Sequence, residues 1–96
     1  MSAFVLYSTA TSDGDSAILT VPNDGREYAL CRVYGTFDGA TVQASADFDN
    51  SGTYCNLADG VWTEEDIKQV YLKPDVKFKL TISGAGGSTS LSSEII

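Results

Sequence analysis

Apolar and polar residues alternate along much of this 96-residue sequence, and a period of two predicts β-strands with one buried face. The alternation is clearest over residues 76–83, where the apolar positions are Val76, Phe78, Leu80 and Ile82. Residues 41–46 repeat the pattern with smaller side chains. Residues 28–37 carry β-branched and aromatic residues on both faces, which is typical of a central strand.

Four shorter segments are further strand candidates because they are rich in β-formers and bounded by turn residues. They are residues 4–8, 17–21, 67–72 and 89–95. Residues that tolerate positive φ mark the expected turns. These are Asp13-Gly14, Asn23-Asp24-Gly25, Asp38-Gly39, Asn50-Ser51-Gly52 and Asp59-Gly60.

The connections follow from the same turn residues. Asp38-Gly39 lies between two alternating runs, so we expect it to close a hairpin. The glycine-rich residues 83–88 separate two strand candidates and predict a long hairpin loop, not a linker. Residues 63–66 begin with a threonine followed by acids, which predicts at most one short helical turn.

Seven short strands at close spacing, with no long helical period, predict an all-β fold. We expect a small β-sandwich or jelly-roll-like barrel of about seven to eight short antiparallel strands. No domain boundary is visible, so residues 1–96 form a single predicted domain. A chain of this length buries only about 60 to 65 per cent of its unfolded surface, so a partner subunit would add useful stability.

Composition and charge narrow the class of partner. Hydrophobic residues make up 43% of the chain and charged residues only 20%, which favours association with other protein. The net charge of -7 argues against nucleic acid and against an anionic membrane surface. No apolar run approaches the roughly 20 residues that cross a bilayer, and no signal peptide is evident. We therefore expect a protein kept in the cytoplasm that makes it, or packaged from it.

Catalytic chemistry is not indicated by the residues present. The chain has no histidine, which removes the commonest general base and the Ser-His and Cys-His nucleophile pairs. We expect no catalytic residue and no cofactor. Cys31 and Cys55 are far apart in sequence and do not form a zinc pattern. They are either free thiols that pack as small hydrophobes or partners in a disulfide.

One segment resembles the opening of a calcium-binding loop. Asp47, Asp49, Ser51 and Gly52 have the spacing of the first half of such a loop, with acids at the first and third positions, an oxygen-bearing residue at the fifth and glycine at the sixth. The match fails at the twelfth position, where Ala58 replaces the bidentate glutamate. We expect a hairpin turn and no bound metal here, with a weak cation site as the alternative.

Six aromatic residues predict either packing or stacking. Core and interface packing is the first interpretation, and stacking on carbohydrate is the alternative. The residues are Tyr7, Tyr28, Tyr34, Tyr54, Trp62 and Tyr71.

Two longer stretches carry a family resemblance. Residues 35–47 read Gly-Thr-Phe-Asp-Gly-Ala-Thr-Val-Gln-Ala-Ser-Ala-Asp and are followed by Asn-Ser-Gly-Thr-Tyr at residues 50–54. Residues 76–91 end their strand in Ser-Gly-Ala before a second strand begins. Together these stretches resemble small structural proteins of tailed-bacteriophage particles. That group usually has Gly-Thr-Thr-Trp after its turn, whereas this chain has Gly-Thr-Tyr-Cys at residues 52–55.

The resemblance implies a non-enzymatic virion protein that decorates or cements the capsid shell. Its implied partner is the major capsid protein, and its implied state is a homo-oligomer, with a trimer favoured. It would be assembled in the host cytoplasm and lie on the capsid surface of the virion. The alternative is a tail or fibre module that binds carbohydrate through Trp62 and tyrosines, with Asp47 and Asp49 holding a cation.

The apolar ends of the chain supply the predicted contacts with protein partners. An end rich in large apolar residues suggests burial against a partner, or else an edge strand with its own core contacts. The contact candidates are Phe4, Leu6, Leu91, Ile95 and Ile96.

Overall fold

The strands of the protein occupy most of the residues that its computed structural model describes, which are residues 4–21, 28–71 and 75–95. No helix occurs within these ranges. The strands are β1 (Phe4–Ala10), β2 (Gly14–Asp15), β3 (Leu19–Thr20), β4 (Tyr28–Thr36), β5 (Thr41–Asp47), β6 (Cys55–Trp62), β7 (Asp66–Tyr71), β8 (Lys77–Ser83) and β9 (Ser90–Ile95).

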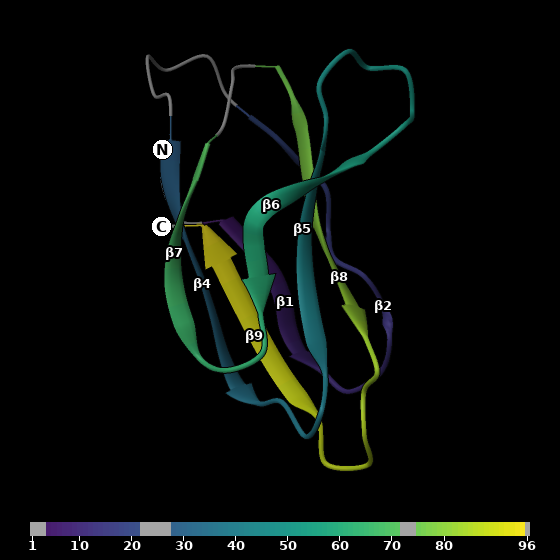
Figure 1. The fold of residues 1–96 in the computed structure, drawn as a ribbon, viewed down its shortest axis with the longest axis vertical. Coiled ribbons are helices and arrows are strands. Elements are labelled where there is room, and N and C mark those ends of the chain that lie inside the picture. The colour runs from purple at the N-terminus through teal and green to yellow at the C-terminus, as the bar shows by residue number, and fades with distance from the viewer. Residues whose placement is uncertain (1–3, 22–27, 72–74, 96) are drawn as a thin grey trace.

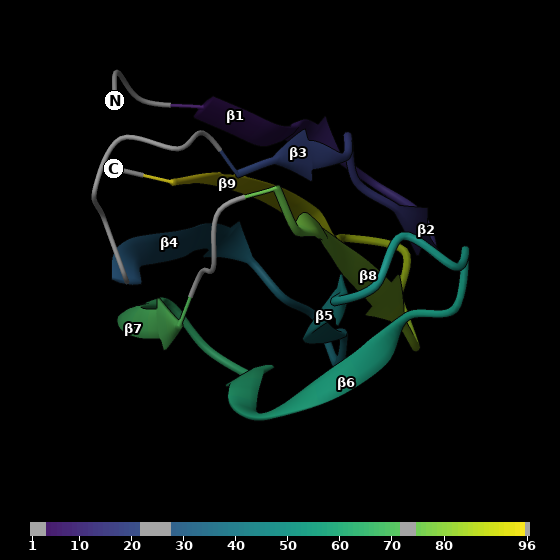
Figure 2. The same cartoon turned by 90° about the horizontal axis from the view of Figure 1, so that it is seen from above.

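The strands form two antiparallel sheets that face each other (Figures 1 and 2). Sheet A has the order β1-β9-β4-β7, and sheet B has the order β2-β8-β5-β6. The short strands β2 and β3 both pair with β8, through Gly14 opposite Ile82 and Leu19 opposite Phe78. They therefore act as one interrupted edge strand of sheet B.

The strand order is that of a jelly roll. With β2 and β3 taken as one strand, the first, eighth, third and sixth strands form sheet A, and the second, seventh, fourth and fifth form sheet B. Jelly rolls are double-sheet antiparallel sandwiches with this arrangement. The prediction of an all-β fold, a small β-sandwich or jelly-roll-like barrel, is confirmed, with nine strands in the described residues where about seven to eight were expected.

The alternation that predicted the strands also determines the core. On β8, Phe78, Leu80 and Ile82 are buried, while Lys77 and Ser83 are exposed. The inward residues of both sheets form one cluster, in which Trp62 and Phe78 are among the largest fully buried side chains. Burial of apolar side chains between the sheets is the main term that stabilises such a fold.

Two predicted hairpins are instead crossings between the sheets. The turn at Asp38 and Gly39 forms as expected, with positive φ at both residues and a 3.0 Å hydrogen bond from Ala40 N to the Phe37 carbonyl. It joins β4 of sheet A to β5 of sheet B, so the hairpin prediction is wrong. Residues 83–88 likewise connect β8 of sheet B to β9 of sheet A. Alternation shows which face of a strand is buried but does not show which sheet the strand joins.

The predicted turn at Asp59-Gly60 is also wrong, because both residues lie within β6. Between the pairs Gln43–Val61 and Ser45–Asn56, the chain advances five residues along β6 but only two along β5, so β6 bulges outward here. The side-chain amide of Gln43 holds the bulge by donating to the carbonyls of Leu57 (3.0 Å) and Gly60 (3.3 Å). The turn-forming pair Asp59-Gly60 thus marks a bulge within a strand and not a turn between strands.

Other predictions have mixed outcomes. The true hairpin joins β5 to β6 around Asn50 and Gly52, as expected, and both residues have positive φ. Strand β2 was not predicted. The turn expected at residues 23–25 and the strand end expected at residue 72 lie outside the described residues.

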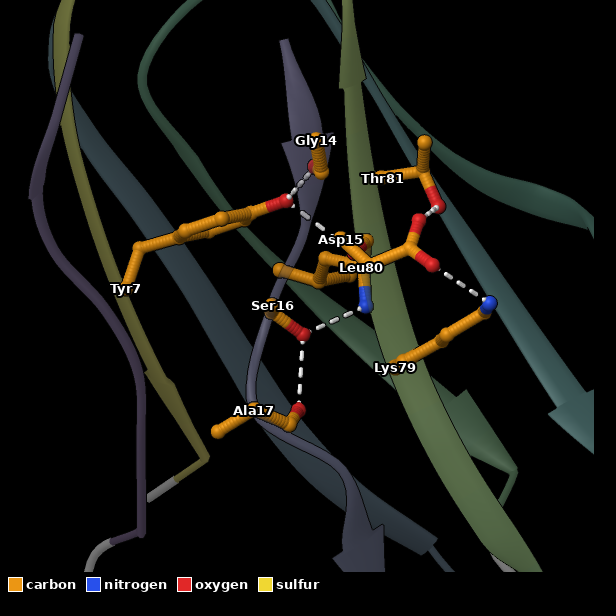
Figure 3. Close-up of polar contacts among 8 residues, drawn as sticks. All are labelled: Tyr7, Gly14, Asp15, Ser16, Ala17, Lys79, Leu80 and Thr81. Atoms are coloured by element: carbon orange, nitrogen blue, oxygen red, sulfur yellow. Dashed lines mark hydrogen bonds and ion pairs between the residues drawn. The ribbon is translucent and has the colours of Figure 1, made fainter. Parts of the chain in front are cut away.

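Tyr7 of β1 links the two sheets along one side of the sandwich (Figure 3). Its hydroxyl lies 2.5 Å from the Gly14 carbonyl and 3.0 Å from the Leu80 carbonyl, and donates to them. Nearby, the amide of Ser16 donates to Leu80 and the amide of Ala17 donates to Leu6. This side of the sandwich is therefore closed by hydrogen bonds that join β1 of sheet A to strands of sheet B and to the segment between β2 and β3.

We expect Tyr7→Phe to lower the free energy of unfolding by about 1 to 2 kcal/mol at neutral pH, because the buried Leu80 carbonyl and the part-buried Gly14 carbonyl lose the O–H donor that they share. Burial raises the pKa of Tyr7 from 10.0 to about 12. The stability that the neutral hydroxyl contributes is therefore complete below pH 10 and is lost as pH rises through 12. Urea unfolding from pH 8 to 12 should show the gap between wild type and variant narrowing above pH 10. The exposed Tyr34→Phe is the control, and a gap that stays constant with pH would contradict this assignment.

Gly35 occupies a position that only glycine fits. Its φ is +119°, and an added Cβ would lie 2.1 Å from the Ser90 carbonyl oxygen. We expect Gly35→Ala to cost about 2 to 4 kcal/mol in chemical denaturation, from backbone strain and displacement of β9. Gly87 has open space around it, so Gly87→Ala should stay within about 0.5 kcal/mol of wild type. Equal midpoints for the two variants would show that this close approach is absent.

Candidate functional site

The outer face of sheet A carries most of the large apolar side chains that the structure leaves exposed. On β4, Ala29, Cys31 and Val33 point inward, so Leu30 and Tyr34 point outward and are 44% and 39% exposed. The same side of the sheet has Val5 on β1, 56% exposed, and Ile67 on β7, 50% exposed. Two other exposed large hydrophobic residues, Ile18 and Phe48, lie away from this sheet.

Strand register places four outward residues in one row across sheet A. Val5 pairs with Glu94, Glu94 pairs with Arg32, and Arg32 pairs with Ile67. Directly paired residues of antiparallel strands share a face and lie about 5 Å apart. The row is therefore apolar at both ends and charged in the middle. We call Val5, Leu30, Tyr34 and Ile67, together with Arg32 and Glu94, the apolar face.

The arginine at the centre of the apolar face is held by two neighbours. Its Nη2 donates to Oε1 of Glu94, and its guanidinium carbon lies 4.2 Å from the centre of the Tyr34 ring. Its Nε is buried and has no hydrogen-bond partner in the described part of the chain. The ion pair is partly solvated, so it adds at most about 1 kcal/mol to stability. Its main effect is to fix the guanidinium in place.

A hollow of about 520 Å³ lies along β4 and β7 beside this arginine. Glu65 lies at its rim and accepts a 3.0 Å hydrogen bond from the amide of Gly35. A second hollow of about 240 Å³ lies between β6 and β7, beside Leu57 and Val70.

The contact residues proposed from the sequence lie elsewhere. Leu6, Leu91 and Ile95 are buried in the core of the chain, and Phe4 is half-buried against it. Ile96 lies outside the described residues. Leu91 and Ile95 make core contacts within the chain, as the alternative predicted, but β9 is a central strand between β1 and β4 and not the edge strand of that alternative. Among the described residues, four of the six exposed large hydrophobic side chains belong instead to the apolar face.

Sequence reasoning missed the apolar face although its signal was present. Leu30 and Tyr34 are apolar residues at outward positions of an alternating strand; the sequence pattern predicts a central position for this strand, and interface packing is one of the interpretations of Tyr34. Ile67 lies in a segment where alternation is too short to assign a side. An apolar residue on both faces of a strand indicates either double burial or an interface, and only the partner strands distinguish the two.

In the segment that resembles a calcium-binding loop, residues 47–52, the acidic side chains accept hydrogen bonds from backbone amides of the same segment. The carboxylate of Asp47 accepts hydrogen bonds from the amides of Ser51 (3.1 Å) and Gly52 (2.9 Å). Hydrogen bonds from Ser51 hold the pKa of the Asp49 carboxyl below its usual value. Within the described ranges, no three acidic, cysteine or histidine side chains are grouped so as to hold a metal. The geometry is that of the hairpin turn.

The cysteines and the tryptophan are not site residues either. Cys31 and Cys55 are free thiols, the first buried and the second exposed. Burial raises the pKa of Cys31 to about 12, so its thiol stays protonated. Trp62 is 1% exposed and donates from Nε1 to the Asp66 carbonyl at 3.3 Å. It therefore presents no ring face for stacking on carbohydrate.

Comparison with known proteins gave no match to this chain, whether to family models, curated sequences or solved structures. Among the described residues, none belongs to a helix with the length and apolar character needed to cross a membrane.

We expect Asp47→Asn to lower the free energy of unfolding by about 1 to 3 kcal/mol, because the amide group turns a donor toward backbone N–H groups that need an acceptor. The exposed Asp59→Asn should leave stability within about 0.5 kcal/mol of wild type. Thermal unfolding measured with millimolar calcium or with EDTA should give the same Tm for wild type. A rise in Tm with calcium that Asp47→Asn abolishes would instead establish a cation site.

Proposed function

We propose that this chain is a non-enzymatic structural protein of a tailed-phage particle, which decorates or cements the capsid shell. The observation that carries the proposal is the apolar face, which offers four exposed large hydrophobic residues around a fixed arginine. Exposed large apolar side chains gathered on one face mark sites where proteins bind proteins. The face supplies the contact through which the chain enters the assembly.

The composition of the apolar face supports a protein partner. Tyrosine and arginine are enriched among residues that dominate binding energy at interfaces, and here Arg32 is stacked on Tyr34. An arginine that is already fixed loses less conformational freedom when a partner binds. The jelly-roll order supports a virion role only by analogy, because viral capsid proteins, lectins and cupins all use it.

A shell offers many identical sites, which suits a small domain with a modest interface. Many weak contacts made at once hold a subunit far more tightly than one contact does. The proposed partners are therefore the major capsid protein and further copies of this chain. The place of action that follows is the capsid surface.

The alternative, a tail or fibre module that binds carbohydrate, has less support. Trp62 is buried, and the two tyrosines with described exposed surface have cations over their rings. Arg32 lies over Tyr34, and Lys79 lies 4.3 Å from the centre of the Tyr54 ring. A sugar would have to displace these cations before it could stack.

We expect purified particles of the phage that encodes this chain to contain it at about one copy per major capsid protein, as measured by quantitative mass spectrometry. Identical sites across the shell are the physical reason for that ratio. A ratio below about one to ten would favour the tail or fibre, and absence from the particles would overturn both virion roles.

The same measurement can test the apolar face. Particles grown with Ile67→Glu should contain much less of the chain, because a charge then occupies the face. Phe48→Glu makes the same chemical change at a residue 48% exposed in the β5–β6 loop, and should leave incorporation unchanged. Equal incorporation of the two variants would show that the apolar face is not the contact.

A further inference from the structure

We propose that a second copy of this chain covers the apolar face, with a two-fold axis that runs parallel to the strands between β9 and β4. The inference rests on the proposed function in that it names a partner for the same face. It is argued from the order of charges in the row across sheet A. No described strand lies over this side of the sheet (Figure 2).

The row across sheet A is complementary to itself under one rotation. From β1 to β7 it reads Val5, Glu94, Arg32, Ile67. A two-fold axis along the strands, placed between Glu94 and Arg32, reverses the order of the row in the second copy. Each Arg32 then faces a Glu94 of the other copy, and each Val5 faces an Ile67. Each charged residue therefore meets a residue of opposite charge across the interface, and each apolar residue meets another apolar residue.

Other ways of placing two faces together lose this match. An axis along the row would set Arg32 against Arg32 and Glu94 against Glu94, which is repulsive. A three-fold arrangement joins two different patches head to tail and cannot place this face on itself. The charge pattern therefore favours a two-fold dimer over the trimer that the phage resemblance implies.

The neighbouring rows fit the same axis. Leu30 and Tyr34 lie on β4, two residues to either side of Arg32 and next to the axis. Each Leu30 is therefore brought close to Leu30 of the second copy. Tyr34 pairs with Ser92 on β9, so in the dimer it crosses over the small Ser92 of the other copy, which leaves room for the ring. Two sheets can pack in this way with their strands nearly aligned.

The arginine has unused donors for such a partner. A guanidinium has five N–H groups, and the described structure gives Arg32 one acceptor, on Glu94 of its own chain. In the dimer, each Arg32 would contact Glu94 of its own chain and Glu94 of the second copy. The two arginines and two glutamates would then form one charge network at the axis. Networks of this kind contribute more than isolated surface pairs do.

The size of the face limits the strength of the dimer. Four strands about 4.8 Å apart and about 20 Å long cover roughly 400 Å² per copy. Stable interfaces bury about 800 Å² per partner, so a dissociation constant on the order of 10⁻⁴ M is expected. The dimer would be sparse in dilute solution and would form where copies are crowded, as they are on a shell.

Charge exchange between two variants gives the test. Arg32→Glu alone and Glu94→Arg alone each place like charges across the two-fold axis, whereas a one-to-one mixture restores opposite charges at both contacts of a mixed dimer. In sedimentation velocity at up to about 1 mM, wild type should approach twice its 10.2 kDa mass. Each single variant should remain monomeric, and the mixture should regain the dimer.

The control is Lys79→Glu, which makes the same charge change as Arg32→Glu and breaks the ion pair between Lys79 and Asp15 on sheet B. It should leave dimerisation within twofold of wild type. Circular dichroism and urea unfolding would verify that every variant is folded. A monomeric wild type at 1 mM, a trimer, a mixture that stays monomeric, or loss of the dimer in Lys79→Glu would each overturn the two-fold dimer. The copy number in particles is measured separately, so the virion role can stand or fall independently.

Discussion

The packing of one sheet against the other is the interaction on which the rest of the structure depends. Val42 and Ala44 of β5 face inward beside Phe78 and Leu80 of β8, and each is fully buried. Because side chains alternate along a strand, fixing the inward residues also fixes every outward residue. The apolar face is thus a product of the core: Arg32 and Tyr34 point outward because Cys31 and Val33 point inward.

Much of the fold was predictable from local pattern, and the arrangement of its strands was not. The alternation of β8 and β5 correctly gave strands and their buried sides, because burial acts residue by residue. The pairing of β1 with β9 joins segments more than eighty residues apart in sequence, and no local pattern specifies such a contact. The Asp38-Gly39 turn has the expected geometry, yet the strand before it, β4, belongs to sheet A and the strand after it, β5, belongs to sheet B.

The candidate site was less predictable for the same reason. The large apolar residues near the chain ends were predicted to contact a partner or the chain's own core, and Leu6, Leu91 and Ile95 are buried within the chain itself. The row of Val5, Glu94, Arg32 and Ile67 exists only once four strands from distant parts of the sequence are aligned. A shift of one residue in the pairing of any of these strands would break the row. The order of charges in the row is therefore set by the strand register and cannot be predicted from amino-acid composition.

The central position of β9 has a consequence for how the chain is made. Sheet A consists of β1, β4 and β7 arranged around a strand that is among the last described residues to be synthesised. Until β9 emerges from the ribosome, β1 has no paired strand and the edge of β4 that pairs with β9 is open. Sheet A therefore cannot assemble until the residues of β9 have been synthesised, and it then closes contacts of large sequence separation, which is intrinsically slow. During that interval its unpaired strand edges and apolar residues are open to association with other copies.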